Sequence, residues 1–159
     1  MKNEKGRHQQ FIETNGVRLR TVVEGQGPLV ILLHGFPRCW YLWRDQIDPL
    51  KAAGYRVAVP DQRGYGATTG HTPGYDVDLR EFALTNAARD AMALVAALGR
   101  RHVDLLIGHD FGSWVAGTAA MMRPEVFRAV VMMSAPYRAP LPLELGGHVP
   151  PSPDPLHID

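Results

Sequence analysis

Short apolar runs alternate with helical patterns along the chain. Residues 29–33 (LVILL) are apolar throughout, which is typical of a strand buried on both faces. Further short runs rich in apolar residues predict four more strands, at residues 18–23, 55–59, 103–107 and 128–134.

The clearest helix is predicted over residues 79–98. Asp78 with Glu81 predicts a capping pair at its start, and Gly99 predicts its end. One face of this helix is apolar because its residues recur at intervals of three or four: Leu84, Ala88, Ala91, Val95 and Leu98.

Two other helices are predicted between the strands. One spans about 111–122 and ends before Pro124. The other begins near Asp48–Pro49, where a capping residue precedes a proline suited to the first helical position. Strands that alternate with helices predict the α/β class, with a mostly parallel sheet covered by helices on both faces.

The proline content of the chain rises from about residue 136 onward. Seven of the 13 prolines lie between Pro136 and Pro155, where neither helix nor strand can continue for long. We therefore expect residues 1–137 to form one domain and residues 138–159 to form a proline-rich tail or the start of a lid.

Charge and cysteine content restrict the class of protein further. The net charge of +1 predicts no partner among nucleic acids or anionic membranes. A single cysteine, Cys39, excludes an intrachain disulfide and favours the cytoplasm. We expect no signal peptide and no membrane span, because MKNEKGRHQQ has no apolar segment behind its charges and no apolar run approaches 18 residues. We also expect no cofactor and no metal.

Gly108-His109-Asp110-Phe111-Gly112 follows a predicted strand and precedes a predicted helix. A strand that turns at once into a helix strains the central residue and pushes its side chain outward, and glycines two positions away avoid collisions. This pattern fits a nucleophile at Asp110. It fits equally well a plain turn in which Asp110 caps the helix.

Two other motifs also follow predicted strands, where a parallel sheet places its chemistry. Leu33-His34-Gly35-Phe36-Pro37 can aim a backbone N–H of Phe36 at a nucleophile, although alone it favours a turn that closes a strand. Asp61-Gln62-Arg63-Gly64-Tyr65-Gly66 alone predicts a tight turn.

Together, the three motifs resemble the α/β-hydrolase family. The segments HGFPRCWYLWRDQI, GYRVAVPDQRGYGAT and GHDFGSW stand in the order and spacing of that family, and within it they are most similar to epoxide hydrolases. The resemblance covers roughly residues 11–137. It implies an α/β-hydrolase fold that stops before the lid and the last strands.

The resemblance implies a role for each motif. Asp110 is the expected nucleophile, and the backbone N–H groups of Phe36 and Phe111 are the expected oxyanion-hole donors. The Phe36–Pro37 peptide bond is often cis in such proteins. Pro37 and Trp40 are expected near the substrate pocket.

Other residues of these motifs are expected to be structural. Trp114 is expected to pack in the core rather than line the pocket. His34 is usually structural, and His109 is expected to point away from the nucleophile because side chains alternate along a strand. His71 and His102 are expected at the surface.

An aspartate nucleophile restricts the reaction. A carboxylate that attacks a saturated carbon gives an alkyl ester that water can cleave, whereas a serine would give a stable ether. The expected substrate is therefore a small hydrophobic epoxide or a related electrophile. A haloalkane or haloacid dehalogenase is the alternative, although Phe111 lacks the side-chain donor that would hold a leaving halide.

The family machinery also needs a histidine to activate water and an acid to orient it. The histidines after Asp110 are His148 and His157, which stand in the proline-rich segment without a preceding strand. We expect neither to be the base, and we expect the chain to be inactive alone. We assign no catalytic role to the other polar candidates of this region: Tyr137, Glu144, Asp154 and Asp159.

The last predicted strand, residues 128–134, leaves an apolar edge with one charge and no proline. Such an edge pairs with another copy, with a partner chain that carries the rest of the fold, or with an aggregate. A non-catalytic fragment that associates through this edge is therefore the third alternative.

Overall fold

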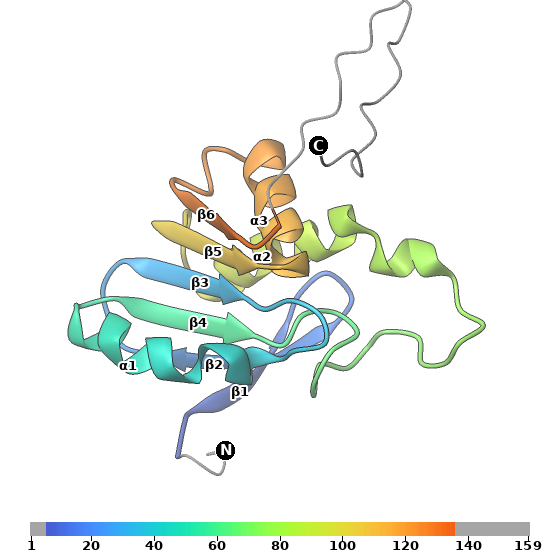
Figure 1. Ribbon diagram of the computed structural model, residues 1–159, viewed down its shortest axis with the longest axis horizontal. Coiled ribbons are helices and arrows are strands. Elements are labelled where there is room, and N and C mark those ends of the chain that lie inside the picture. The colour runs from blue at the N-terminus through green and yellow to red at the C-terminus, as the bar shows by residue number, and fades with distance from the viewer. Residues whose placement is uncertain (1–5, 136–159) are drawn as a thin grey trace, which may run out of the picture.

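A computed structural model describes residues 6–135, and the expectations for residues 136–159 lie outside the described residues. The described chain builds one six-stranded sheet in the order β1-β2-β4-β3-β5-β6 (Figure 1). The strands β4, β3, β5 and β6 run parallel, while β1 and β2 are antiparallel to their neighbours. The strands are β1 (Gln9–Glu13), β2 (Arg18–Glu24), β3 (Leu29–Leu33), β4 (Arg56–Pro60), β5 (Leu105–His109) and β6 (Val130–Met133).

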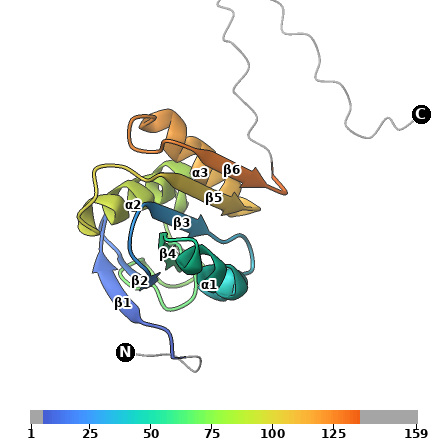
Figure 2. The same cartoon turned by 90° about the vertical axis from the view of Figure 1, so that its left-hand side faces the viewer.

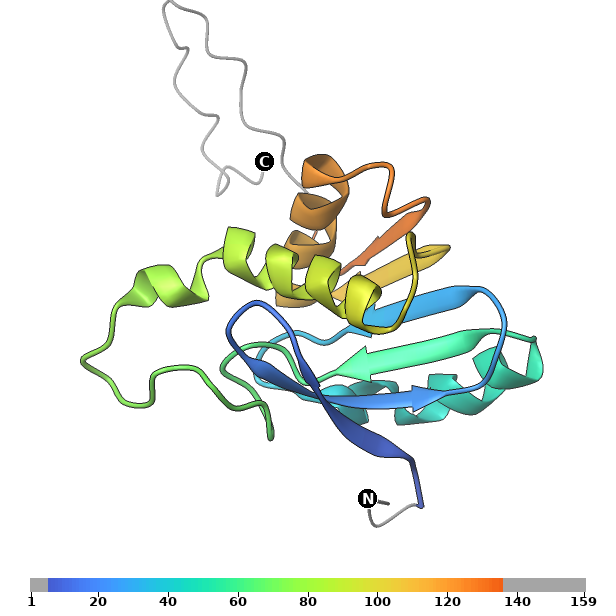
Figure 3. The same ribbon diagram turned by 180° about the vertical axis from the view of Figure 1, so that it is seen from behind.

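Helices cover both faces of this sheet, as the sequence predicts. Helix α1 lies on one face, and α2 and α3 lie on the other, where they are seen in front of the sheet from behind (Figures 2 and 3). Two short 3-10 helices, η1 and η2, precede α1 and α2. The bounds are η1 (Trp40–Trp43), α1 (Arg44–Ala52), η2 (Leu79–Phe82), α2 (Leu84–Ala97) and α3 (Phe111–Met122).

The helix predicted over residues 79–98 is two helices. The backbone of Ala83 is extended (φ −57°, ψ 146°), so η2 ends there and α2 begins with the next residue. The Asp78 carboxylate accepts the Arg80 N–H and caps η2, whereas Glu81 accepts the Thr72 N–H. The predicted capping pair therefore does not cap a single long helix.

Helix α1 starts earlier than the prediction near Asp48–Pro49. It begins at Arg44, directly after η1, and Pro49 lies inside it. Trp43 and Ile47 are buried against the sheet, so packing draws these residues into helical structure. Proline removes one backbone hydrogen bond from the helix, and here the helix continues through it.

The core has one layer on each side of the sheet. Every residue of β3 is buried, as its apolar sequence predicts. On one side Leu29, Ile31 and Leu33 pack with the apolar faces of α2 and α3, and on the other Val30 and Leu32 pack with α1 and η1. This packing fixes the carboxyl ends of β3, β4 and β5, where the three motifs stand.

The outer strand β6 is left partly open. Val131 and Met133 are each 42% exposed, while their neighbours along the strand are less so. Val131 and Met133 pair with Ile107 and His109 of β5, so these residues share one face of the sheet. Among residues 6–135, no helix is both long and apolar enough to cross a membrane.

Candidate active site

Asp110 stands at the sharp turn between β5 and α3. Its backbone lies in the left-handed half of conformational space (φ 54°, ψ −123°), which is costly for any residue other than glycine. A Cβ on Gly112 would lie 2.5 Å from the Leu33 oxygen and 2.6 Å from the His34 oxygen. Any side chain at position 112 would therefore collide with the end of β3, and only glycine fits there. The strained turn expected from the sequence is confirmed.

The turn is tied to the end of β6. The Asp110 N–H donates to the Met133 oxygen at 2.9 Å. The Ser113 hydroxyl lies 2.8 Å from both the Gly108 and Met133 oxygens, and it accepts the Met133 N–H at 2.9 Å. These contacts hold Asp110 in place without using its carboxylate, which stays available for other partners.

The carboxylate of Asp110 faces two backbone donors. The Phe36 N–H donates to Oδ1 at 2.9 Å, and the Phe111 N–H also donates to the carboxylate. Hydrogen bonds from Phe111 first, and then from Phe36, hold the pKa of Asp110 below its usual range because they stabilise the charged form. The predicted trio of Asp110, Phe36 and Phe111 is therefore brought together.

The loop that carries Phe36 is held by the loop after β4. The Phe36–Pro37 peptide bond is cis, as the family resemblance suggested. The buried Asp61 carboxylate accepts the Trp40 N–H at 2.8 Å and the Ala67 N–H at 3.0 Å, and Arg20 lies 3.5 Å from it. The motif that alone predicted a tight turn thus links two loops of the site.

A buried ion pair anchors this second loop to α2. Arg63 donates through Nε and Nη2 to the two carboxylate oxygens of Asp90, at 2.9 and 2.7 Å. Arg63 Nη2 also donates to the Asn15 oxygen at 2.9 Å. Because two nitrogens of the Arg63 guanidinium bind the two oxygens of one carboxylate, this ion pair fixes the loop between β4 and η2 at the carboxyl ends of the strands.

A shallow cleft of about 390 Å³ is lined by Phe36 and Phe111, whose N–H groups face the Asp110 carboxylate, although Asp110 itself does not line it. The rings of Phe36, Tyr65, Phe82 and Phe111 supply most of its apolar wall, and Gln62 and Arg63 supply polar groups. Burial, and then the Asp110 charge, raises the pKa of Tyr65. Tyr65, Gln62 and Phe82 are site residues that the sequence reasoning did not assign, although Tyr65 and Gln62 lie in a motif that it singled out.

The structure places the two tryptophans of the motifs, Trp114 and Trp40, in different surroundings. Trp114 is 46% exposed on α3, so the prediction that it packs in the core is wrong. Helix α3 turns its small residues toward the sheet, which leaves this large ring outside. Trp40, expected near the pocket, is buried with Trp43 under α1, and neither Trp40 nor Pro37 lines the 390 Å³ cleft.

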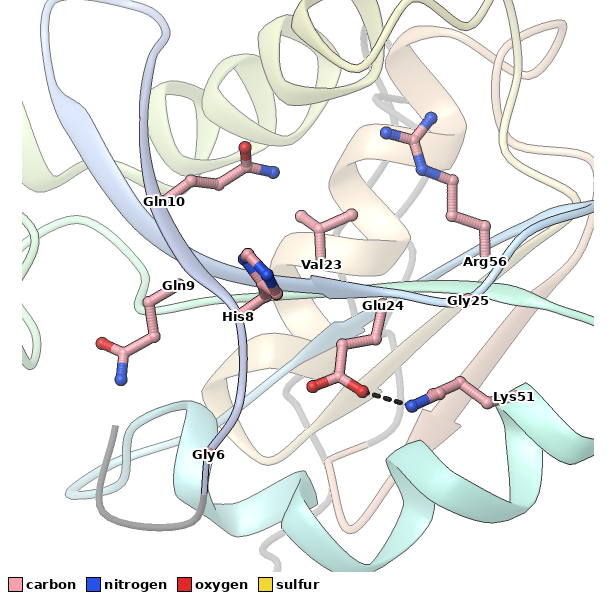
Figure 4. Close-up of a pocket in the computed structure, with 9 residues that line it drawn as sticks. All are labelled: Gly6, His8, Gln9, Gln10, Val23, Glu24, Gly25, Lys51 and Arg56. Atoms are coloured by element: carbon pink, nitrogen blue, oxygen red, sulfur yellow. Dashed lines mark hydrogen bonds and ion pairs between the residues drawn. The ribbon is translucent and has the colours of Figure 1, made fainter. Parts of the chain in front are cut away.

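A larger open cleft of about 580 Å³ is found at the opposite edge of the sheet (Figure 4). Its charged groups are mixed in sign, and Lys51 Nζ pairs with Glu24 Oε2 at 2.5 Å. Glu24 ends the antiparallel β2 and Arg56 begins β4, so this cleft lies at the amino ends of the parallel strands. Asp110 follows the carboxyl end of β5, so the 580 Å³ cleft and Asp110 lie at opposite ends of the parallel strands.

The histidines of the described chain do not supply a base for Asp110. His34 is fully buried, and its two ring nitrogens contact the backbones of Gly35 and Gln62. His109 Nδ1 is buried without a hydrogen-bond partner in residues 6–135. His71 and His102 are half-buried, and 36% of the His102 side chain is exposed. Within the same residues, no group of three His, Cys, Asp or Glu side chains could hold a metal ion. His148 and His157 lie outside the described residues.

Comparison with protein families matches residues 28–154 to the α/β-hydrolase fold. The chain therefore belongs to the α/β-hydrolase family. Within that family it is similar to epoxide hydrolases. It is 38% identical over 126 residues to an epoxide hydrolase of Caballeronia sordidicola, and 38% identical over 130 residues to the AB hydrolase superfamily protein YfhM of Bacillus subtilis.

Solved structures give the same result. An epoxide hydrolase from an endophytic Streptomyces superposes with a TM-score of 0.77 and 42% identity, over 85% of this chain and 39% of its own. An epoxide hydrolase from Vigna radiata superposes with a TM-score of 0.79 and 34% identity, over 89% of this chain and 42% of its own. The resemblance inferred from the motifs and the α/β-hydrolase fold are confirmed.

The chain is much shorter than these relatives. The two sequence alignments cover about 80% of this chain. They cover only 36% of the Caballeronia protein and 43% of the Bacillus protein. The activity of a whole relative is therefore a proposal when it is transferred to this chain.

Proposed function

We propose that this chain carries the nucleophile and the oxyanion hole of an epoxide hydrolase. The observation that supports the proposal is the position of the Asp110 carboxylate, which stands on a strained turn and accepts backbone N–H groups of Phe36 and Phe111. Those bonds keep Asp110 ionised, which is the form that attacks. They also bring to the carboxylate the backbone N–H donors that a developing oxyanion requires.

In the proposed first step, one carboxylate oxygen of Asp110 bonds to an epoxide carbon. The C–O bond of the ring breaks, its electron pair stays on the ring oxygen, and that oxygen takes a proton from water. The product is an ester between Asp110 and the opened substrate. The Phe36 N–H keeps Oδ1 in place while the other oxygen attacks.

In the proposed second step, water adds to the carbonyl carbon of the Asp110 ester. Negative charge develops on the carbonyl oxygen, where the N–H groups of Phe36 and Phe111 stabilise it. Breaking the bond to the alkyl oxygen then releases a diol and restores Asp110. This step needs a histidine base and an acid, and residues 6–135 place neither beside the ester. We therefore propose that the chain alone stops at the ester.

The test uses an aryl epoxide, styrene oxide, and intact-protein mass spectrometry. The wild-type chain should gain the mass of one epoxide, and Asp110→Asn should gain none. Asp45→Asn, which removes an exposed carboxylate of α1, is the matched control and should gain the same mass as wild type. Steady diol release by the purified chain would show that the base is present after all, and absence of any Asp110 adduct would contradict the proposal.

A dehalogenase remains the second enzymatic proposal, and the same assay separates the two. With a haloalkane in place of the epoxide, an adduct accompanied by release of one halide ion would favour dehalogenation. Phe111 argues against it, because its side chain has no N–H to hold the leaving halide. We expect the epoxide to react and the haloalkane to remain unchanged.

The open side of β6 supports a proposal of a different class. We propose that β6 pairs with a polypeptide that carries the remaining strands, and that a second copy takes this place when no such chain is present. Val131 and Met133 are half-exposed apolar residues on this edge strand, and the matched relatives extend well beyond the length of this chain.

Sedimentation velocity over a range of concentrations tests the pairing. Wild type should associate, and Val131→Asp should stay monomeric. A charge at Leu79, an exposed residue of η2 away from this edge, is the control and should not prevent association. A wild-type chain that remains a monomer at every concentration would refute the self-pairing. Asp110→Asn should associate as wild type does.

A further inference from the structure

His34 contacts the Gly35–Phe36 peptide, whose N–H group is one of the two expected oxyanion donors. It is fully buried at the carboxyl end of β3. Its Nε2 accepts the backbone N–H of Gln62 at 3.0 Å, and its Nδ1 lies 3.0 Å from the oxygen of Gly35. The Gln62 side-chain amide also donates to the His34 oxygen. The imidazole therefore connects the loop after β4 to the loop after β3.

These two contacts determine which ring nitrogen carries the hydrogen. A backbone N–H can only donate, so Nε2 must be the accepting nitrogen. A carbonyl oxygen can only accept, so Nδ1 must carry the hydrogen. Burial lowers the pKa of His34, which keeps the ring neutral and leaves this tautomer in place.

The Gly35 oxygen and the Phe36 N–H belong to the same peptide group. That peptide is trans, so its C=O and N–H point in opposite directions. His34 Nδ1 and the Arg38 N–H hold the oxygen end, the latter at 2.9 Å. Asp110 Oδ1 lies 2.9 Å from the nitrogen end. A rotation that turned the Phe36 N–H away from Asp110 would break the contact with His34.

We propose that His34 is a positioning residue that fixes the Phe36 N–H toward the Asp110 carboxylate. The value of this role for catalysis rests on the proposed function of Asp110. His34 touches no substrate and acts through the Gly35–Phe36 peptide. Its effect falls on the second step, in which charge grows on the oxygen that the Phe36 N–H holds.

Two substitutions separate positioning from packing. Asparagine at position 34 retains an N–H donor close to the place of Nδ1 and has nothing at Nε2. Glutamine reaches toward the place of Nε2 and leaves the Gly35 oxygen with the Arg38 N–H alone. Both variants lose the ring that packs edge-on against Tyr65, with centroids 5.0 Å apart. A purely structural role therefore predicts that both lose thermal stability and otherwise behave alike.

The first readout is the NMR titration of the Asp110 carboxyl in the full chain. In His34→Gln its pKa should rise toward the ordinary carboxyl value, whereas in His34→Asn it should stay near wild type. The second readout is the loss of the preformed styrene oxide ester at pH 9, followed by intact mass. We expect it to be about 10-fold slower in His34→Gln than in His34→Asn, as misplacing one oxyanion donor implies.

Equal behaviour of the two variants in both readouts would overturn the proposal. If a variant fails to fold, the ¹⁵N spectrum of the wild-type His34 ring decides: hydrogen on Nδ1 supports the proposal, and hydrogen on Nε2 refutes it. A wild-type chain that forms no ester would refute the function proposed for Asp110. The titration and the tautomer would still test the positioning by His34, so the two failures are distinguishable.

Discussion

Replacing Gly35 by alanine should displace the Asp110 carboxylate directly. A Cβ at this position would lie 2.5 Å from Asp110 Oδ1 and 2.7 Å from the His109 oxygen. Non-bonded heavy atoms pack best at about 3.5–4.0 Å, so these groups must separate by about 1 Å. Overpacking of this kind costs about 1–3 kcal/mol, a large part of the 5–15 kcal/mol that is typical of a domain.

Urea unfolding measures that cost, and the NMR titration of Asp110 measures the displacement. The pKa of Asp110 should rise in Gly35→Ala because the Phe36 N–H no longer reaches Oδ1. Gly99→Ala is a control of similar cost, because Gly99 has φ +72° and a Cβ there meets no atom within 4 Å. Gly99→Ala should lose stability with Asp110 unchanged. If Gly35→Ala behaves in the same way, the close approach of Gly35 to the carboxylate does not matter to the site.

Three further predictions concern the supports and the charge of the site. Asp90→Asn leaves the buried Arg63 without its ionic partner and should cost about 3–5 kcal/mol in urea unfolding, whereas removing the exposed Glu125 should leave the midpoint nearly unchanged. Ser113→Ala removes the hydroxyl that serves Gly108 and Met133 and should cost about 1–3 kcal/mol by the same measurement. The lowered pKa of Asp110 means that its carboxylate stabilises the fold above the unfolded pKa of about 3.9, and that this stability is lost as the pH falls through the lower folded pKa. Ester formation should therefore have its acid midpoint below about pH 3.9, and a midpoint above that value would contradict the role of the two N–H donors.

The fold follows from the sequence wherever the signal is local. The apolar run of β3 predicts a buried strand, and the glycines around Asp110 predict a strained turn, because each pattern can be read from consecutive residues. Strand β1, QQFIE, carries little apolar signal because it lies at the sheet edge and pairs with β2 alone. The periodic apolar residues begin at Leu84 and therefore describe α2 alone, whereas the predicted start at residue 79 rests on Asp78 and Glu81, of which Asp78 caps η2.

The site is less accessible to sequence reasoning because its contacts are distant along the chain. Phe36 and Asp110 are 74 positions apart, and the family resemblance, not the spacing of the residues, brought them together. The contact between Gln62 and His34 depends on β4 and β3 lying side by side, which no local pattern states. From the sequence Trp114 is expected in the core, but the small residues of α3 face the sheet and leave this ring exposed.

The order of the strands separates the two steps of the proposed reaction. Strands β4, β3 and β5 are neighbours, so the loops that hold Asp110 meet within this chain. A strand added beyond β6 would end two strands away from Asp110, at about 10 Å by the usual strand spacing. A histidine there and a bridging water can span that distance to the ester. Val131→Asp should therefore leave ester formation intact and abolish diol release when a partner supplies that strand. Mass spectrometry and diol assay on the same sample measure both, and equal loss of the two steps would contradict this division.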